Sequence, residues 1–150
     1  MSTSQLEMLT DLARGARDQA GKILAQERQT EQQTTAQLQS LLSYRAEYAE
    51  RLQKAMRDGI DPATMYNYQQ FLASLDAALS RARQALASQQ ASVERSKKNW
   101  QQEQRKLSSY DTLASRRLLE EHRRSERQEQ KTNDDLVTSR AARQHNDTPH

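Results

Sequence analysis

Apolar residues recur along the second half of the chain at alternating steps of three and four positions, from Met65 to Ala114. An apolar repeat of 3.5 residues held over this length is typical of a coiled-coil seam rather than of one face of a globular helix. Few positions of the stripe are polar. Its members are Met65, Tyr68, Leu72, Leu75, Leu79, Ala82, Leu86, Gln89, Val93, Ser96, Trp100, Glu103, Leu107, Tyr110 and Ala114.

The first half of the chain carries two such stripes side by side. Only one of them can face a single partner helix, so we expect part of the other to remain exposed. One stripe holds Leu9, Ala13, Ala16, Ala20, Ile23, Glu27, Thr30, Thr34, Gln37, Leu41, Tyr44 and Tyr48, and the other holds Leu24, Leu38, Leu42, Ala49, Leu52 and Met56.

One break separates the two halves. Gly59 suits a left-handed position after a helix, Asp61 suits an N-cap, and Pro62 suits a first helical residue. Ser4 is the expected N-cap of the first helix, with a glutamate three residues later. We therefore predict an all-α fold, a single long two-helix antiparallel coiled-coil hairpin. Helix 1 should span about 4–57, the turn 58–61, helix 2 about 62–140, and a disordered tail 141–150.

Composition argues against an enzyme. Hydrophobic residues make up 34% of the chain, there is no cysteine, and only three glycines are present. A narrow seam leaves little interior for a catalytic pocket, and we expect no cofactor and no metal site. The histidines do not follow ligand spacing; they are His122, His145 and His150. No secretory signal or membrane-spanning run is visible, so we expect a soluble cytoplasmic protein.

Positive charge gathers toward the C-terminal end. Between Arg95 and Arg143 thirteen basic residues stand against eight acidic ones, so this part contributes +5 to a chain of net charge +3. Such an end suits an acidic partner surface or nucleic acid, although interspersed opposite charges also describe an ordinary solvated helix face.

Two quartets at equal spacing lie on either side of the break and include three aromatic residues. They can meet on one side of the hairpin as an exposed docking strip, or they can all be seam residues. The first is Gln37, Leu41, Tyr44 and Tyr48, and the second is Phe71, Leu75, Ala78 and Ala82.

The same segments resemble the FliJ family of flagellar type III export proteins. The similarity rests on Tyr44-Arg-Ala-Glu-Tyr48-Ala-Glu-Arg-Leu52 and on Tyr66-Asn-Tyr-Gln-Gln-Phe71-Leu-Ala-Ser-Leu75, and it extends from about Leu6 to Arg124. The family carries a polar residue at the last position of the strip, where this chain has Ala82.

The resemblance implies a cytoplasmic coiled coil that lies at the cytoplasmic face of the inner membrane through the export apparatus. Its partners would be the hexameric export ATPase, the cytoplasmic domain of the export gate, and substrate chaperones. The gate would bind Gln37, Leu41, Tyr44, Tyr48, Phe71, Leu75 and Ala78. For this contact we expect Tyr44, Tyr48 and Phe71 to lie largely exposed. For the ATPase we predict contacts in the basic end, at Arg116, Arg117, Arg123, Arg124 and Arg127.

Two other functions fit the residues alone. One is a hairpin that binds nucleic acid non-specifically through its basic end, although acids interrupt the basic run and no aromatic residue follows Tyr110 to stack on bases. The other is a purely structural coiled coil that associates with itself to cover the aromatic strip.

Overall fold

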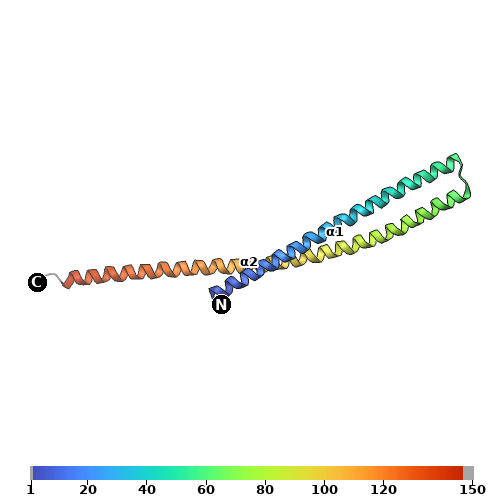
Figure 1. Cartoon of the computed structure of the whole chain (residues 1–150). Helices are drawn as coiled ribbons and strands as arrows, with labels where there is room; N and C mark the ends of the chain where they lie inside the picture. Colours follow the sequence, from blue (N-terminus) through green and yellow to red (C-terminus); the bar gives the residue numbers. More distant parts are fainter. Residues whose placement is uncertain (1, 147–150) are drawn as a thin grey trace. The chain divides into compact units, whose positions relative to one another are not determined.

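The computed structural model describes residues 2–146 and consists of two long helices, α1 (Thr3–Asp58) and α2 (Pro62–Asn146) (Figure 1). The predicted all-α helical hairpin is confirmed. Both helices are longer than expected, and residues 141–146 are helical rather than part of a disordered tail. This segment contains Ala141, Ala142 and Arg143, which favour helix. Residues 147–150 of the predicted tail lie outside the described part of the chain.

The N-cap of α1 is Ser2 rather than Ser4. The Gln5 backbone N–H donates to Ser2 Oγ at 3.2 Å, and the Ser2 backbone N–H donates to Gln5 Oε1 at 3.1 Å. Ser4 therefore lies inside the first turn. The reciprocal pattern is a capping box built two residues upstream of the predicted one.

The turn follows the prediction. Gly59 has φ +94°, a left-handed conformation that glycine adopts without a Cβ clash. Asp61 caps α2, since its side chain accepts a hydrogen bond from the Thr64 hydroxyl and its backbone oxygen accepts one from the Met65 N–H at 3.1 Å. The Thr64 hydrogen bond lowers the pKa of the Asp61 carboxyl. Pro62 is the first residue of α2.

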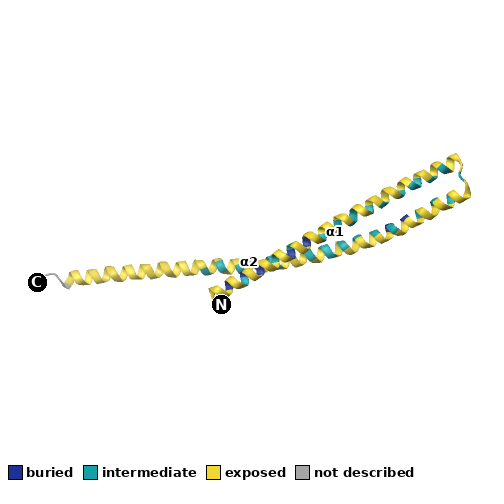
Figure 2. Ribbon diagram, viewed as in Figure 1, coloured by how far each residue is buried: buried dark blue, intermediate teal, exposed yellow. Residues whose placement is uncertain are grey.

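The helices form two compact units. The turn unit comprises Gly15–Gln104, and the termini unit comprises Met1–Arg14 with Arg105–His150. Buried residues recur along the facing sides of the helices, and every residue from 118 to 145 is exposed (Figure 2). The core of the turn unit contains Ala20, Leu24, Leu75 and Leu79, and that of the termini unit contains Leu6, Ala13 and Leu107.

The predicted seam of α2 is confirmed, because every position of the stripe from Met65 to Ala114 is buried or half-buried. Within the termini unit the two helices lie side by side, since Leu6 of α1 and Ala114 of α2 line one cavity. In the turn unit, cross-helix contacts join Glu27 to Gln89 and Arg45 to Asp76. Glu27 is farther from the turn than Arg45, and its partner Gln89 is likewise farther from the turn than Asp76. The two helices of the turn unit are therefore antiparallel.

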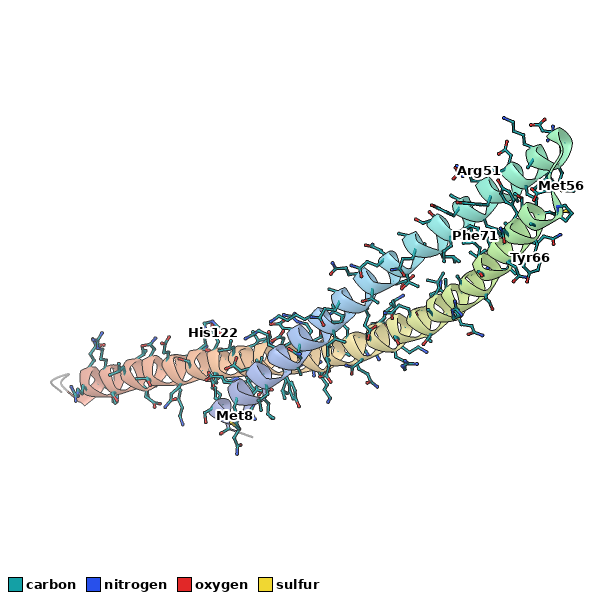
Figure 3. The ribbon with its side chains drawn as sticks, turned by 45° about the vertical axis from the view of Figure 1, so that its right-hand side comes forward. Met8, Arg51, Met56, Tyr66, Phe71 and His122 are labelled. Atoms are coloured by element: carbon teal, nitrogen blue, oxygen red, sulfur yellow. The ribbon has the colours of Figure 1, made fainter. Side chains whose placement is uncertain are left out.

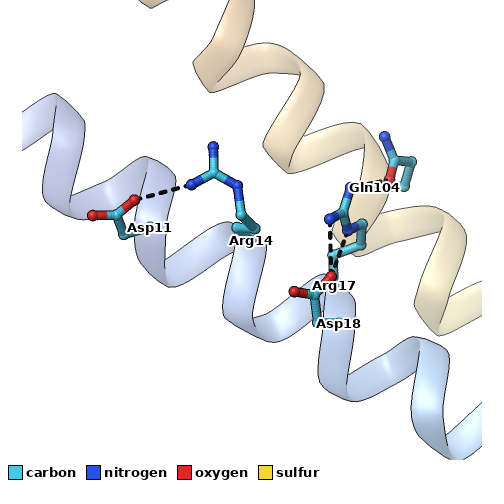
Figure 4. A network of polar contacts seen from close by, with 5 residues as sticks. All are labelled: Asp11, Arg14, Arg17, Asp18 and Gln104. Atoms are coloured by element: carbon cyan, nitrogen blue, oxygen red, sulfur yellow. Dashed lines mark hydrogen bonds and ion pairs between the residues drawn. The ribbon is translucent and has the colours of Figure 1, made fainter.

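Neither predicted stripe of α1 is the seam by itself. The observed seam mixes members of both stripes with charged residues, and it leaves Ile23 and Tyr44 exposed. One of its half-buried charged residues is Arg17, whose Nη1 donates to Gln104 Oε1 at 3.4 Å and whose Nη2 donates to Asp18 Oδ1 at 2.9 Å (Figure 4). Within the turn unit the seam of α1 is Arg17, Ala20, Leu24, Glu27, Glu31, Thr34, Leu38, Leu41, Arg45, Tyr48, Leu52 and Ala55.

The three glycines differ in what surrounds them. A Cβ at Gly21 would meet Trp100 Cδ1 and Nε1 at 3.4 Å, an ordinary contact, whereas a Cβ at Gly15 would meet nothing within 4 Å. Trp100 therefore packs against the backbone of α1 at Gly21.

We expect Gly15→Ala to raise the free energy of unfolding by about 1 kcal/mol, because alanine favours helix and the new methyl group has open space. Gly59→Ala should lower it by about 1–2 kcal/mol, because alanine is strained at positive φ. Urea midpoints of both variants measure the two effects. Equal shifts in the same direction would contradict this account of the glycines.

Candidate functional site

An aromatic cluster joins α1 to α2 in the turn unit. Tyr48 lies at its centre, with its ring centroid 5.5 Å from that of Tyr44 on the same helix and 4.4 Å from that of Phe71 on α2. Tyr68 completes the cluster at 6.5 Å from Tyr48. The Tyr44 and Tyr48 rings are stacked, since their planes differ by 20°. Aromatic contacts of this kind fix ring positions and add stability beyond the area that they bury.

The cluster is exposed in part. Tyr44 is 52% exposed and Phe71 is 38% exposed, as expected, but Tyr48 is only partly exposed. Our expectation that Tyr48 lies largely exposed is wrong, because Tyr48 occupies a seam position between the helices. Tyr48 thus supports the two rings that reach solvent.

The remaining residues predicted for gate binding differ in exposure. Gln37 is exposed, Leu41 and Ala78 are half-buried, and Leu75 is buried at 8% exposure. Leu75 belongs to the core of the turn unit and presents no surface. Gln37, Tyr44 and Phe71 are therefore the members of the strip that a partner can reach; with Tyr48 beneath them, we call these residues the docking strip.

Arg51 belongs to the same cluster and was missed from the sequence. Its guanidinium carbon lies 5.1 Å from the centroid of the Tyr48 ring, and its Nη2 donates to Glu47 Oε1 at 2.7 Å. Figure 3 shows Arg51 and Phe71 on the two helices, with Met56 and Tyr66 closer to the turn. The spacing of Arg51, three residues after Tyr48 and seven after Tyr44, places it beside both rings on a helix and could have identified it.

An ion pair joins the two helices close to the cluster. The Arg45 guanidinium donates to the Asp76 carboxylate through Nε and Nη2. These hydrogen bonds hold the pKa of Asp76 below its usual 3.8, the positive charges of Arg45 and Arg83 act in the same direction, and desolvation opposes them. The stabilisation is therefore present above the unfolded pKa and disappears as the pH falls through the lower folded pKa.

We predict that Asp76→Asn makes stability less dependent on acid pH. The wild-type chain should lose more stability than the variant between neutral pH and about pH 2, because position 76 carries a carboxylate that becomes protonated only in the wild-type chain. Urea midpoints at the two pH values measure the difference. Identical losses in both proteins would show that this ion pair contributes nothing to the acid response.

The predicted ATPase contacts lie on α2 in the termini unit. Arg116, Arg123, Arg124 and Arg127 are exposed, and Arg117 is half-buried. Close to them is an open cavity of about 370 Å³, whose lining includes the apolar Leu6, Ala114 and Leu118. Its charged lining residues are of both signs: Glu7, Asp11, Arg14, Arg117 and Glu121. Leu118 is 68% exposed. The basic end thus combines exposed cations with a recess that is lined by apolar residues and by charged residues of both signs.

The described residues contain no group of three or more His, Cys, Asp or Glu side chains that could hold a metal ion. His122 Nε2 lies 3.0 Å from Glu126 Oε1, both in exposed positions on α2. Neither described helix is long and apolar enough to cross a membrane.

Comparisons with known proteins agree on one family. The family model described as Flagellar FliJ protein matches residues 1–146. The Flagellar FliJ protein of Salmonella typhi is 32% identical over 138 residues, and that of Escherichia coli (strain K12) is 30% identical over 138 residues. Each alignment covers 92% of this chain and 94% of the relative.

The fold has a match among solved structures. A YscO homolog from Chlamydia trachomatis has a TM-score of 0.67 and 14% sequence identity, with 97% of this chain and 94% of that chain covered. This likeness concerns the fold. The family match and the two relatives together show that the chain belongs to the flagellar FliJ family and is a component of flagellar type III protein export.

Proposed function

We propose that this export component is a non-catalytic coiled-coil connector between the hexameric export ATPase and the cytoplasmic domain of the export gate. The termini unit binds the ATPase, and the docking strip of the turn unit binds the gate. The connector acts with substrate chaperones and is held at the cytoplasmic face of the inner membrane through these partners. The observation that carries the proposal is the pair of exposed rings, Tyr44 and Phe71, which Tyr48 supports from its seam position.

The docking strip suits a small interface with apolar anchors. Tyr44 and Phe71 come from different helices and are both exposed, while Tyr48 contacts both rings from below. Rings held in place before binding lose little conformational entropy on association. Aromatic side chains are also enriched among the residues that dominate binding free energy.

The basic end suits a partner surface with negative charge. On a helix, Arg116, Arg123 and Arg127 follow one another at steps of seven and four residues, so their side chains share one face of α2. Long-range attraction between opposite charges raises the association rate and weakens with added salt. The exposed Leu118 and its cavity supply apolar area beside these cations.

We predict that Arg123→Glu with Arg124→Glu weakens ATPase binding by at least about tenfold at low salt, mainly through a slower association rate. The matched control is Lys97→Glu with Lys98→Glu, another exposed pair of adjacent cations on α2 but in the turn unit. Surface plasmon resonance at several salt concentrations measures both variants, and circular dichroism checks their helicity. Equal binding by the two variants would remove the basic end from the ATPase contact.

A further inference from the structure

The observed seam leaves one side of the first apolar stripe of α1 exposed. Five residues of α1, spaced seven apart, belong both to the observed seam and to a second possible seam on the neighbouring face. We call them the shared line: Ala20, Glu27, Thr34, Leu41 and Tyr48. One flank of this line completes the observed seam and is buried or half-buried; this inner flank is Arg17, Leu24, Glu31, Leu38 and Arg45. The other flank is exposed throughout; this outer flank is Ala16, Ile23, Thr30, Gln37 and Tyr44.

Either flank makes a complete heptad pattern with the shared line. The inner flank lies three residues before and four after each shared position, and the outer flank lies four before and three after. The inner flank places three charged residues in the seam, whereas the outer flank contains none and offers Ile23 and Tyr44, which are 39% and 52% exposed. The sequence of α1 therefore fits α2 in two neighbouring registers.

Contacts between the helices select the observed register. Gln89 Nε2 donates to the Glu27 backbone oxygen at 3.0 Å and to Glu27 Oε2 at 2.6 Å. Arg45 pairs with Asp76, and Gly21 accommodates Trp100. After a slide of three residues, Leu24 would replace Gly21 beneath Trp100. Polar and size-matched positions of this kind commonly fix the register of a coiled coil at some cost in stability.

We propose that the turn unit is a two-register switch in which α1 slides along α2 by three residues, about 4.5 Å, and exchanges the inner for the outer flank. One-turn shifts of one packed helix past another are a known form of switching. The slide moves α1 away from the turn, so the connection must lengthen by unwinding the last helical turn. Within that turn, Arg57 and Asp58 are exposed and Ala55 is half-buried.

The slide would dismantle the docking strip. Tyr44 would take the seam position of Leu41, and Tyr48 would take the position of Arg45, away from Phe71. The second register would thus withdraw Tyr44 from a partner and remove the support that Tyr48 gives to Phe71. This consequence rests on the proposed gate contact, whereas the existence of two registers does not.

Disulfide trapping tests the two registers directly, because the natural chain has no cysteine. Glu27→Cys with Gln89→Cys reports the observed register, and Thr30→Cys with Gln89→Cys reports the shifted one. Gln33→Cys with Gln89→Cys is the control, since residue 33 is exposed in the observed register and would take the exposed position of Thr30 in the shifted one. A disulfide requires Cα atoms within about 7 Å, so the residue 27 and residue 30 pairs each form in one register and the residue 33 pair forms in neither.

In a glutathione buffer we expect the residue 27 pair to cross-link in most molecules and the residue 30 pair to exceed the control by at least tenfold, with helicity retained by circular dichroism. A residue 30 pair that forms no more disulfide than the control would overturn the switch.

The two trapped forms then test regulation of gate binding. The observed-register form should bind the cytoplasmic gate domain like the wild-type chain, and the shifted form should bind at least tenfold more weakly until a thiol reductant restores binding. Equal binding by both forms would overturn the regulatory role. Loss of binding by the observed-register form alone would contradict the idea that the register controls gate binding. Unaltered binding after truncation of Tyr44 and Phe71 to alanine would instead contradict the proposed gate contact.

Discussion

Replacing Leu79 with alanine should lower the free energy of unfolding by about 2–5 kcal/mol, the range for removing a buried leucine side chain. Leu79 is 3% exposed in a core that is only one seam wide. We expect a value near the lower end of that range, because the neighbouring side chains of a two-helix seam can move into the space or admit water. Urea denaturation followed by circular dichroism measures the change.

The matched control is Leu42→Ala in the same unit. Leu42 is 41% exposed, so its truncation should change stability by about 0.5 kcal/mol or less. Equal destabilisation by Leu42→Ala and Leu79→Ala would contradict the burial of Leu79 and the exposure of Leu42 in the turn unit.

Truncation of Tyr44 or Phe71 to alanine should weaken binding to the export gate by about 2 kcal/mol, which is roughly 30-fold, and leave the melting temperature nearly unchanged. Both side chains are exposed, so little core packing is lost on truncation. Tyr48→Ala should weaken binding and also lower the melting temperature, because Tyr48 lies in the seam and contacts both rings.

Tyr66→Ala is the control for these variants. Tyr66 is an aromatic residue near the turn with 60% exposure, but it is not a member of the aromatic cluster. Isothermal titration with the gate domain and thermal unfolding of each variant separate binding from stability. Normal gate binding by Tyr44→Ala and Phe71→Ala, or equal weakening by Tyr66→Ala, would contradict a specific role for the cluster.

The sequence predicted α2 more accurately than α1 for a physical reason. Along α2 the 3,4 pattern from Met65 to Ala114 has a single continuous apolar stripe, and hydrophobic burial alone selects it. Along α1 the apolar residues divide between two stripes, and the seam accepts Arg17, Glu27 and Arg45 because each finds a polar partner across the seam. Partners of this kind become visible only when the register between the helices is known.

The site was predictable in part. The spacing of Tyr44 and Phe71 identified an aromatic meeting point of two helices, and the structure brings these residues to either side of Tyr48. Burial of Leu75 and partial burial of Tyr48 depend on which face of α1 meets α2, which the two competing stripes left open. The cap at Ser2 was missed because Ser2 and Ser4 both fit a capping pattern and only the backbone geometry separates them.

Co-purification of a three-component mixture tests the connector most directly. The tagged export ATPase is mixed with this chain and with the cytoplasmic gate domain, and the bound fractions are quantified. We expect the ATPase to retain the gate domain through the wild-type chain. A chain carrying Tyr44→Ala and Phe71→Ala should be retained without the gate domain, and the double charge reversal at Arg123 and Arg124 should abolish retention of both. Retention of the gate domain by the ATPase to the same extent with all three chains would contradict a connector with two separate docking surfaces.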